Sequence, residues 1–385
     1  MQRNQFTRSE KHGKSRQDFP RPCMTAELPR ECCCSAATEG VKMKSIRAIF
    51  VAAIWLGLAI DPFQPGATSE AAQGQKPAVG AGAESAKAPE PSEKTDPSLV
   101  KVDVLVTDDD GRVLAGLKRG NFRVFDNGIP QPVVDFAPTS APITIVVLME
   151  YSAASYNYFA GKAADWGTAF LSHLEPRDWV ALTTFDLRPK VQVDFTHQQY
   201  EVRDAIAQLG YPKFREINLY DALEETLDNL DKVRGRKSIL LLATGLDSMS
   251  TINQDQIYDR LKRTDATIFC VGLAEAEYIR YGGGALSYLQ GKNALTQFAK
   301  QTGGLALFPR FEGELPDIFR SVVGFLRSEY TLSFRPPPES RDGRYHLLKV
   351  EIVGPDGKPL KVTDEKGKKR KIEIFAREGY MALKG

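Results

Sequence analysis

Residues 143–149, with the sequence ITIVVLM, constrain the fold of this chain more than any other stretch. All of them are apolar except Thr144, so the segment has no polar face, which predicts a strand that is buried on both sides. A polar stretch, residues 150–155, follows directly, and a helical pattern begins at Tyr156. A buried strand, a polar loop and a helix open a typical α/β sheet, which binds ligands outside the carboxyl ends of its strands. Residues 150–155 are therefore the first candidate for a binding loop.

Apolar strands and amphipathic helices alternate after this segment. The patterns predict strands at residues 179–185, 191–195, 238–243, 267–273 and 305–308, and helices at residues 158–173, 198–209, 220–233, 252–263, 293–301 and 315–326. Residues 274–291 are expected to form a loop, and its glycines at 282–284 are expected to precede no helix. Gly303 is a helix C-cap signal. This alternation predicts a doubly wound, Rossmann-like, mostly parallel sheet over residues 141–328.

Two β segments flank the α/β region. Apolar and polar residues alternate in VKVDVLVT, FRVFDNG and PVVDF before it, and in TLSFRP, YHLLKVEIVG, PLKV and residues 371–375 after it. Each segment is too short to bury its own apolar face. We therefore expect residues 98–140 and 329–385 to pack together as a β-sandwich-like unit, with contacts between residues 99–136 and 330–380.

The N-terminal part resembles an export signal and a linker. Residues 1–42 are polar and without periodicity, which predicts a disordered extension. Residues 43–67 begin with Met43, Lys44 and Arg47 and continue into a short apolar run, which predicts a secretory signal if translation starts at Met43. The run is too short for a membrane span. Residues 68–97 read as a flexible linker. We expect an exported protein, periplasmic or extracellular, with no stable membrane span in its mature form.

Composition and missing motifs narrow the function classes. The net charge of +2 gives no electrostatic reason to expect nucleic-acid binding. Cys270 lies in an apolar run and is expected to be a buried thiol. No phosphate-binding glycine loop follows a predicted strand, and no G-x-S-x-G motif occurs. The four histidines lie in different predicted elements, which argues against a histidine metal centre or triad.

From about residue 142 to about residue 327 the sequence resembles the von Willebrand factor type A domain. The matching stretches occur in the order expected of that family: IVVLMEYSAAS, WVALTTFD, INLYDALEETL, KSILLLATGLD, TIFCVGL and LTQFAKQTGGLALFP. The flanking stretches VDVLVTDDDGRVLAGLKRGNFRVFDNGIPQPVVDF, EYTLSFRPP and AREGYMAL look like those of the acidobacterial VWFA-related domain family. The resemblance covers roughly residues 98 to 383, and it implies a type A fold with a binding role.

The resemblance also implies a metal-ion-dependent adhesion site, from which this chain departs. The family holds a divalent cation with an Asp-x-Ser-x-Ser loop, a Thr and a second Asp. In this chain Ser152 is retained, but the other four positions differ. Glu150 replaces the first Asp, Ala154 the second Ser, Ile217 the Thr and Thr244 the second Asp. Mg²⁺ requires several hard oxygen ligands in octahedral geometry. We therefore expect a degenerate site with no metal ion and no other cofactor.

We expect a non-enzymatic module that binds a protein or glycan partner at the carboxyl edge of the sheet. The candidate ligand-binding residues are Glu150, Ser152, Ser155, Thr244 and Asp247. One alternative is a structural β-sandwich scaffold in which the type A domain is a spacer. A further alternative is a hydrolase that uses Glu150, Asp186 or Asp247 as acid and base. The predicted loops offer no histidine or activated nucleophile for such a reaction.

Overall fold

The computed structural model describes residues 98–138, 142–156, 162–273, 284–363 and 367–384, which all belong to one compact unit. The expectations for residues 1–42, 43–67 and 68–97 lie outside the described residues. Within the described part of the chain, no helix is long and apolar enough to cross a membrane.

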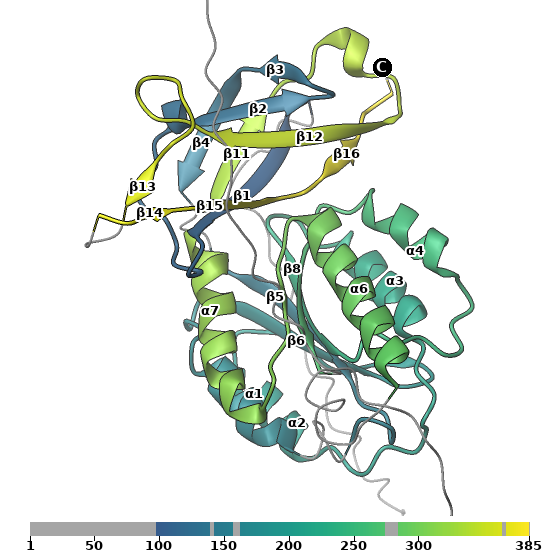
Figure 1. The fold of residues 1–385 in the computed structure, drawn as a ribbon. Helices are drawn as coiled ribbons and strands as arrows, with labels where there is room; N and C mark the ends of the chain where they lie inside the picture. The colour runs from purple at the N-terminus through teal and green to yellow at the C-terminus, as the bar shows by residue number, and fades with distance from the viewer. Residues whose placement is uncertain (1–97, 139–141, 157–161, 274–283, 364–366, 385) are drawn as a thin grey trace, which may run out of the picture. The chain divides into compact units, whose positions relative to one another are not determined.

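A six-stranded sheet with the order β10-β9-β8-β5-β6-β7 forms the α/β part (Figure 1). Its strands are β5 (Thr144–Glu150), β6 (Trp179–Phe185), β7 (Pro189–Thr196), β8 (Ser238–Ala243), β9 (Thr267–Gly272) and β10 (Ala306–Leu307). All neighbouring strands are parallel except β6 and β7. The chain leaves β5 for β6 on one side and later returns to β8 on the other, so the strand order reverses at β5. The predicted doubly wound, mostly parallel sheet is confirmed.

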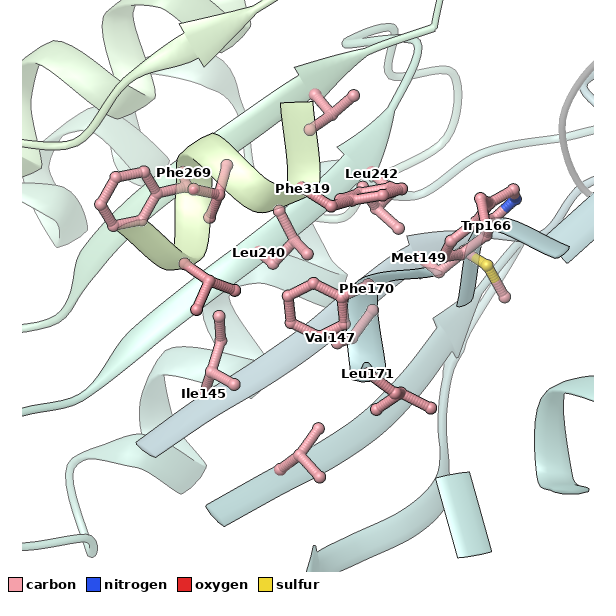
Figure 2. Close-up of a cluster of buried hydrophobic side chains, with 14 of the residues drawn as sticks. Ile145, Val147, Met149, Trp166, Phe170, Leu171, Leu240, Leu242, Phe269 and Phe319 are labelled. Carbon is pink, nitrogen blue, oxygen red and sulfur yellow. The ribbon is translucent and has the colours of Figure 1, made fainter. Parts of the chain in front are cut away.

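Helices cover both faces of this sheet (Figure 1). One face packs against α1 (Ala163–Leu171), α2 (Gln199–Ala207) and α7 (Leu315–Ser328), and the other against α3 (Leu219–Leu230), α4 (Gln254–Leu261) and α6 (Ala285–Thr302). Figure 2 shows the first of these two cores, in which Trp166, Phe170 and Phe319 lie with Val147 and Met149 of β5. Since both cores draw on β5, every residue of this strand is buried, as the apolar sequence predicted.

Helix α6 differs from the sequence-based expectation. It begins at Ala285, eight residues before the predicted start at residue 293, and Gly284 is its N-cap. The predicted loop is therefore wrong for residues 285–291. None of residues 285–290 is buried, so this part of the helix has no apolar stripe that a sequence pattern could reveal. The helix ends as predicted, with Gly303 at a φ of 85° in the left-handed region.

Two antiparallel sheets form the flanking unit, with strand orders β15-β1-β11-β4 and β16-β12-β2-β3. The strands before the α/β part are β1 (Val100–Asp108), β2 (Phe122–Asp126), β3 (Ile129–Gln131) and β4 (Val133–Pro138). Those after it are β11 (Tyr330–Phe334), β12 (Tyr345–Ile352), β15 (Ile372–Ala376) and β16 (Gly379–Met381), with a separate hairpin of β13 (Val362–Thr363) and β14 (Lys369–Arg370). Each four-stranded sheet combines strands from both segments, which confirms the expected flanking β unit. The segment boundaries near residues 140 and 328 stay predictions.

Arg236 links the α/β part to the flanking β unit. Its guanidinium group donates to the backbone oxygen of Leu326 at 2.7 Å, pairs with Glu329 and lies 3.6 Å from Asp103 of β1. Glu329 is almost fully buried between α7 and β11. Leu105 of β1 is part of the first α/β core. The two parts therefore share buried apolar and charged contacts.

Candidate binding surface at the switch point

Glu150 and Thr244 meet at the point where the strand order reverses. Glu150 is the last residue of β5, and its side chain is fully buried. Thr244 directly follows the neighbouring strand β8. Its backbone N–H and its hydroxyl both donate to Oε2 of Glu150, each at 2.8 Å. A carboxylate that ends a buried strand thus receives two hydrogen bonds from the adjacent loop.

Ser152 and Ser155 complete this polar cluster. The Ser152 hydroxyl donates to Oε1 of Glu150 at 3.4 Å and lies 3.2 Å from the Ser155 hydroxyl. The Ser155 N–H donates to Oγ of Ser152 at 3.3 Å. All four residues are at most 5% exposed. The structure therefore brings Glu150, Ser152, Ser155 and Thr244 together, but buries them too deeply to touch a partner directly.

Asp247 has a different role from the one expected. Its Oδ1 accepts from the N–H of Tyr220 at 3.2 Å, and its Oδ2 accepts from the N–H of Ser250 at 3.2 Å. The Ser250 hydroxyl also bonds to Oδ1. The carboxylate therefore holds the start of α3 against the turn after β8.

Ile217 occupies the position of the family's metal-binding Thr. It is buried, and its N–H and C=O both form hydrogen bonds with Ser248.

The side-chain oxygens of this cluster do not fit the divalent cation that the type A fold implies. Mg²⁺ takes hard oxygen ligands in near-octahedral geometry and retains several waters. Here one carboxylate is surrounded by hydroxyl groups, and both its oxygens already accept hydrogen bonds from the protein. Over the described residues, no group of three or more His, Cys, Asp or Glu side chains could hold a metal ion. The buried Glu150 carboxylate is thus stabilised by hydrogen bonds from Thr244 and Ser152, in place of the positive charge of a cation.

Helix α6 packs tightly against the loop after β8. A Cβ atom at Gly245 would lie 2.3 Å from the backbone oxygen of Gly291, and one at Gly291 would lie 2.3 Å from that of Thr244. Gly245 also has a φ of 81°. Gly291 lies in the part of α6 where the sequence predicts a loop. The loop after β8 is thus held both by α6 and by the hydrogen bonds between Thr244 and Glu150.

Exposed apolar side chains gather in the segments around the carboxyl edge of the sheet. Of the eight large apolar side chains exposed in described residues 142–328, six lie in these segments: Tyr211, Phe214, Met249, Leu286, Leu289 and Phe311. They belong to the connections α2–α3, β8–α4 and β10–α7 and to the first turns of α6. The sequence does not reveal them as a group, because single exposed apolar residues in loops leave no periodic pattern.

The loop after β5 supports part of this exposed surface. The Tyr151 hydroxyl donates to the backbone oxygen of Gly210 at 2.6 Å, and the N–H of Ala153 donates to that of Phe214 at 2.6 Å. The Tyr156 ring lies 4.5 Å from the Tyr211 ring, centroid to centroid. Burial raises the pKa of Tyr151 to about 12, so its hydroxyl keeps the proton that it donates. Hydrogen bonds therefore connect the loop after β5, which holds part of the polar cluster, to the α2–α3 connection with its exposed Tyr211 and Phe214.

A separate cleft of about 470 Å³ lies between β7 and α3. Its lining includes Val191, Phe195, Glu225 and Asn229, and none of the predicted site residues.

No family model matches this chain, and a search of the curated proteins gives no match either. Among solved structures, it is similar to a von Willebrand factor type A protein from Catenulispora acidiphila (11% identity, 74% of this chain and 75% of that chain, TM-score 0.39). It is also similar to the vWF domain of the type V pili tip protein Mfa5 from Porphyromonas gingivalis (11% identity, 49% and 96%, TM-score 0.39). A third similar structure is the conserved hypothetical protein BatB from Bacteroides thetaiotaomicron (12% identity, 48% and 100%, TM-score 0.37).

The strand order itself agrees with the sequence resemblance. The sequence resemblance implied a type A fold, and the structure has a doubly wound, mostly parallel sheet with helices on both faces. The α/β part of this chain has a von Willebrand factor type A-like fold.

Proposed function

We propose that this chain is an exported, non-enzymatic binding module that docks a protein partner at the carboxyl edge of its type A-like sheet without a metal ion. The observation that carries the proposal is the collection of six exposed apolar side chains at that edge. Tyr, Phe and Met are enriched at protein interfaces, as is Arg. Lys213 and Arg215 are exposed in the same loop as Tyr211 and Phe214.

The buried cluster has a structural role in this proposal. Glu150 fixes the loops after β5 and β8 through hydrogen bonds, and the close contact of Gly245 with Gly291 holds α6 against the loop after β8. A surface that is already rigid loses less conformational entropy on binding. The buried polar cluster would thus support the binding surface, while the exposed apolar side chains beside it contact the partner. This cluster consists of the predicted residues Glu150, Ser152, Ser155 and Thr244.

The hydrolase alternative has weaker support. Glu150 is buried with both oxygens engaged, and Asp247 accepts from Tyr220 and Ser250. Asp186 accepts a long hydrogen bond, 3.4 Å, from the N–H of Arg188. A general acid or base must reach the proton that it transfers, and a buried, fully bonded Glu150 does not offer that access. The scaffold alternative predicts that changes at the apolar surface leave partner binding intact.

The experiment compares two surface variants of the full chain. The first combines Tyr211→Ser, Phe214→Ser and Met249→Ser. The control is Tyr200→Ser, because Tyr200 is also exposed but lies at the start of α2, at the opposite edge of the sheet. Each protein is immobilised and exposed to envelope and secreted proteins of the source cell, with and without EDTA, and bound proteins are identified by mass spectrometry.

We expect one partner to bind the unaltered chain and the control equally, with or without EDTA. Its binding to the triple variant should fall at least ~tenfold, since the loss of one interface hot spot costs about 2 kcal/mol or more and tenfold corresponds to about 1.4 kcal/mol. Equal binding to the triple variant would support the scaffold alternative. Loss of binding in EDTA would show that the surface depends on a metal ion. Binding that survives protease treatment of the captured material but not periodate oxidation would identify a glycan.

A further inference from the structure

His346 lies between two carboxylates in the flanking β unit. It belongs to β12, and its Nδ1 lies 2.7 Å from Oδ1 of Asp126 in β2. Its Nε2 lies 3.2 Å from Oδ1 of Asp342, in the segment before β12. His346 is 5% exposed and Asp126 is 2% exposed. A buried imidazole ring thus faces a carboxylate oxygen from each of its nitrogens.

With both carboxylates ionised, this geometry favours a proton on each ring nitrogen. Neutral imidazole has one N–H group and one lone pair, and an ionised carboxylate can only accept. One of the two contacts would therefore place a lone pair against a carboxylate oxygen if the ring were neutral. Oδ2 of Asp126 acts as an acceptor, because it receives the Tyr380 hydroxyl at 3.1 Å. Asp342 also acts as an acceptor, since its Oδ1 receives the N–H of Arg344 at 2.8 Å.

The charges around His346 favour its protonated form. Burial by itself lowers the pKa of His346, but the hydrogen bonds to Asp126 and Asp342 outweigh burial, so the net pKa is raised above its ordinary value. The hydrogen bond from Arg344 contributes most to lowering the pKa of Asp342. The Arg344 side chain itself is 84% exposed, and its Nε lies 3.9 Å from Oδ2 of Asp342.

The same cluster anchors the C-terminal strand β16. Tyr380 of β16 donates to Asp126 and packs against the Phe334 ring at 5.9 Å. The strand is three residues long and pairs only with β12 in its sheet. Beyond it, the N–H of Ala382 donates to the backbone oxygen of Arg344 at 2.8 Å. A strand this short depends strongly on its side-chain anchor, which in turn depends on the charge balance at Asp126.

We propose that His346 carries a proton at neutral pH and that loss of this proton at alkaline pH releases β16 from β12. The groups that face the ring are Asp126 from β2, Asp342 from the preceding segment and Tyr380 from β16. A histidine whose pKa is higher in the folded state than in the unfolded state stabilises the folded state. This stabilisation is complete below about pH 6.5, which is the pKa of histidine in the unfolded state. The stabilisation is lost as the pH rises through the folded pKa. The C-terminal strand is therefore a pH-controlled element.

Two measurements on the full chain test this proposal. The first is NMR of histidine ring nitrogens with selective labelling, in which His346→Gln identifies the His346 signals. We expect both ring nitrogens of His346 to be protonated at pH 7. The second is hydrogen exchange of the Leu348 and Ala382 amides, which bond to Glu378 and Arg344. Their protection factors should fall by up to ~tenfold per pH unit above the His346 pKa, relative to amides that pair β1 with β11.

The variants separate titration from simple damage to the sheet. His346→Gln should give low protection of β16 with no step between pH 6 and 9. Asp342→Asn keeps the histidine but removes one carboxylate, so the loss of protection should move to lower pH. His173→Gln, outside the cluster, should behave as the unaltered chain. Two results in the unaltered chain would overturn the proposal. One is a neutral His346 ring at pH 7, and the other is protection of the Ala382 amide that stays constant from pH 6 to 9.

Discussion

Thr244 donates two hydrogen bonds to one oxygen of Glu150, each at 2.8 Å, across a sequence separation of 94 residues. One donor is the backbone N–H and the other is the hydroxyl, so the two can be separated by substitution. Thr244→Val keeps the size of the side chain and the N–H but removes the hydroxyl. Because the carboxylate is buried, we expect the free energy of unfolding to fall by about 1–3 kcal/mol.

Chemical denaturation of the full chain measures this effect. The matched control is Thr168→Val, because the Thr168 hydroxyl is exposed and donates to the preceding turn of α1, at the Ala164 oxygen. We expect that control to change stability by less than about 0.5 kcal/mol. Equal effects of the two substitutions would mean that Glu150 does not depend on Thr244.

The contact between α6 and the loop after β8 gives the second prediction. Gly291→Ala would place a Cβ 2.3 Å from the backbone oxygen of Thr244, so one of the two backbones must move. We expect a loss of stability of about 1–3 kcal/mol. Gly324→Ala in α7 is the control, because a Cβ there meets nothing within 4 Å. It should stabilise the chain by about 0.5–1 kcal/mol, since alanine favours a helix over glycine. The same sign for both substitutions in thermal unfolding would contradict this packing.

Arg236 gives the third prediction. Arg236→Ala leaves the buried carboxylate of Glu329 without its partner, and breaking a buried ion pair costs about 3–5 kcal/mol. Arg320→Ala also removes an ion pair, but Arg320 and Asp317 are both exposed, so the expected loss is within about 1 kcal/mol. Denaturant unfolding of both variants tests the difference. A loss for Arg236→Ala no larger than for the control would show that the α/β part and the β unit are not held by this pair.

Much of this fold could be predicted from the sequence, because buried strands have a clear pattern. The predicted strands at residues 179–185 and 238–243 agree with β6 and β8. β3 and β16 were missed, since three residues are too few to show alternation. The start of α6 was missed because its first turns bury nothing.

The candidate site was less predictable for a different reason. Its position followed from the end of β5, but its burial depends on contacts with Thr244 and α6, which lie far away in the sequence. The sequence predicts Asp247 as a ligand-binding residue beside Glu150, whereas in the structure a local turn uses its carboxylate. The exposed Tyr211 and Phe214 carry no sequence signal that separates them from core aromatics.

We propose that hydrogen bonds from the protein, and not a metal ion, hold the switch point. Calorimetric titration of the full chain with millimolar Mg²⁺, and in parallel with Mn²⁺, tests this proposal. The positive control combines Glu150→Asp, Ala154→Ser, Ile217→Thr and Thr244→Asp, which restores the family's oxygen ligands on the same fold and should create or strengthen binding. For the unaltered chain we predict no binding isotherm and no effect of EDTA on unfolding. A one-site isotherm at micromolar affinity for the unaltered chain would contradict the account.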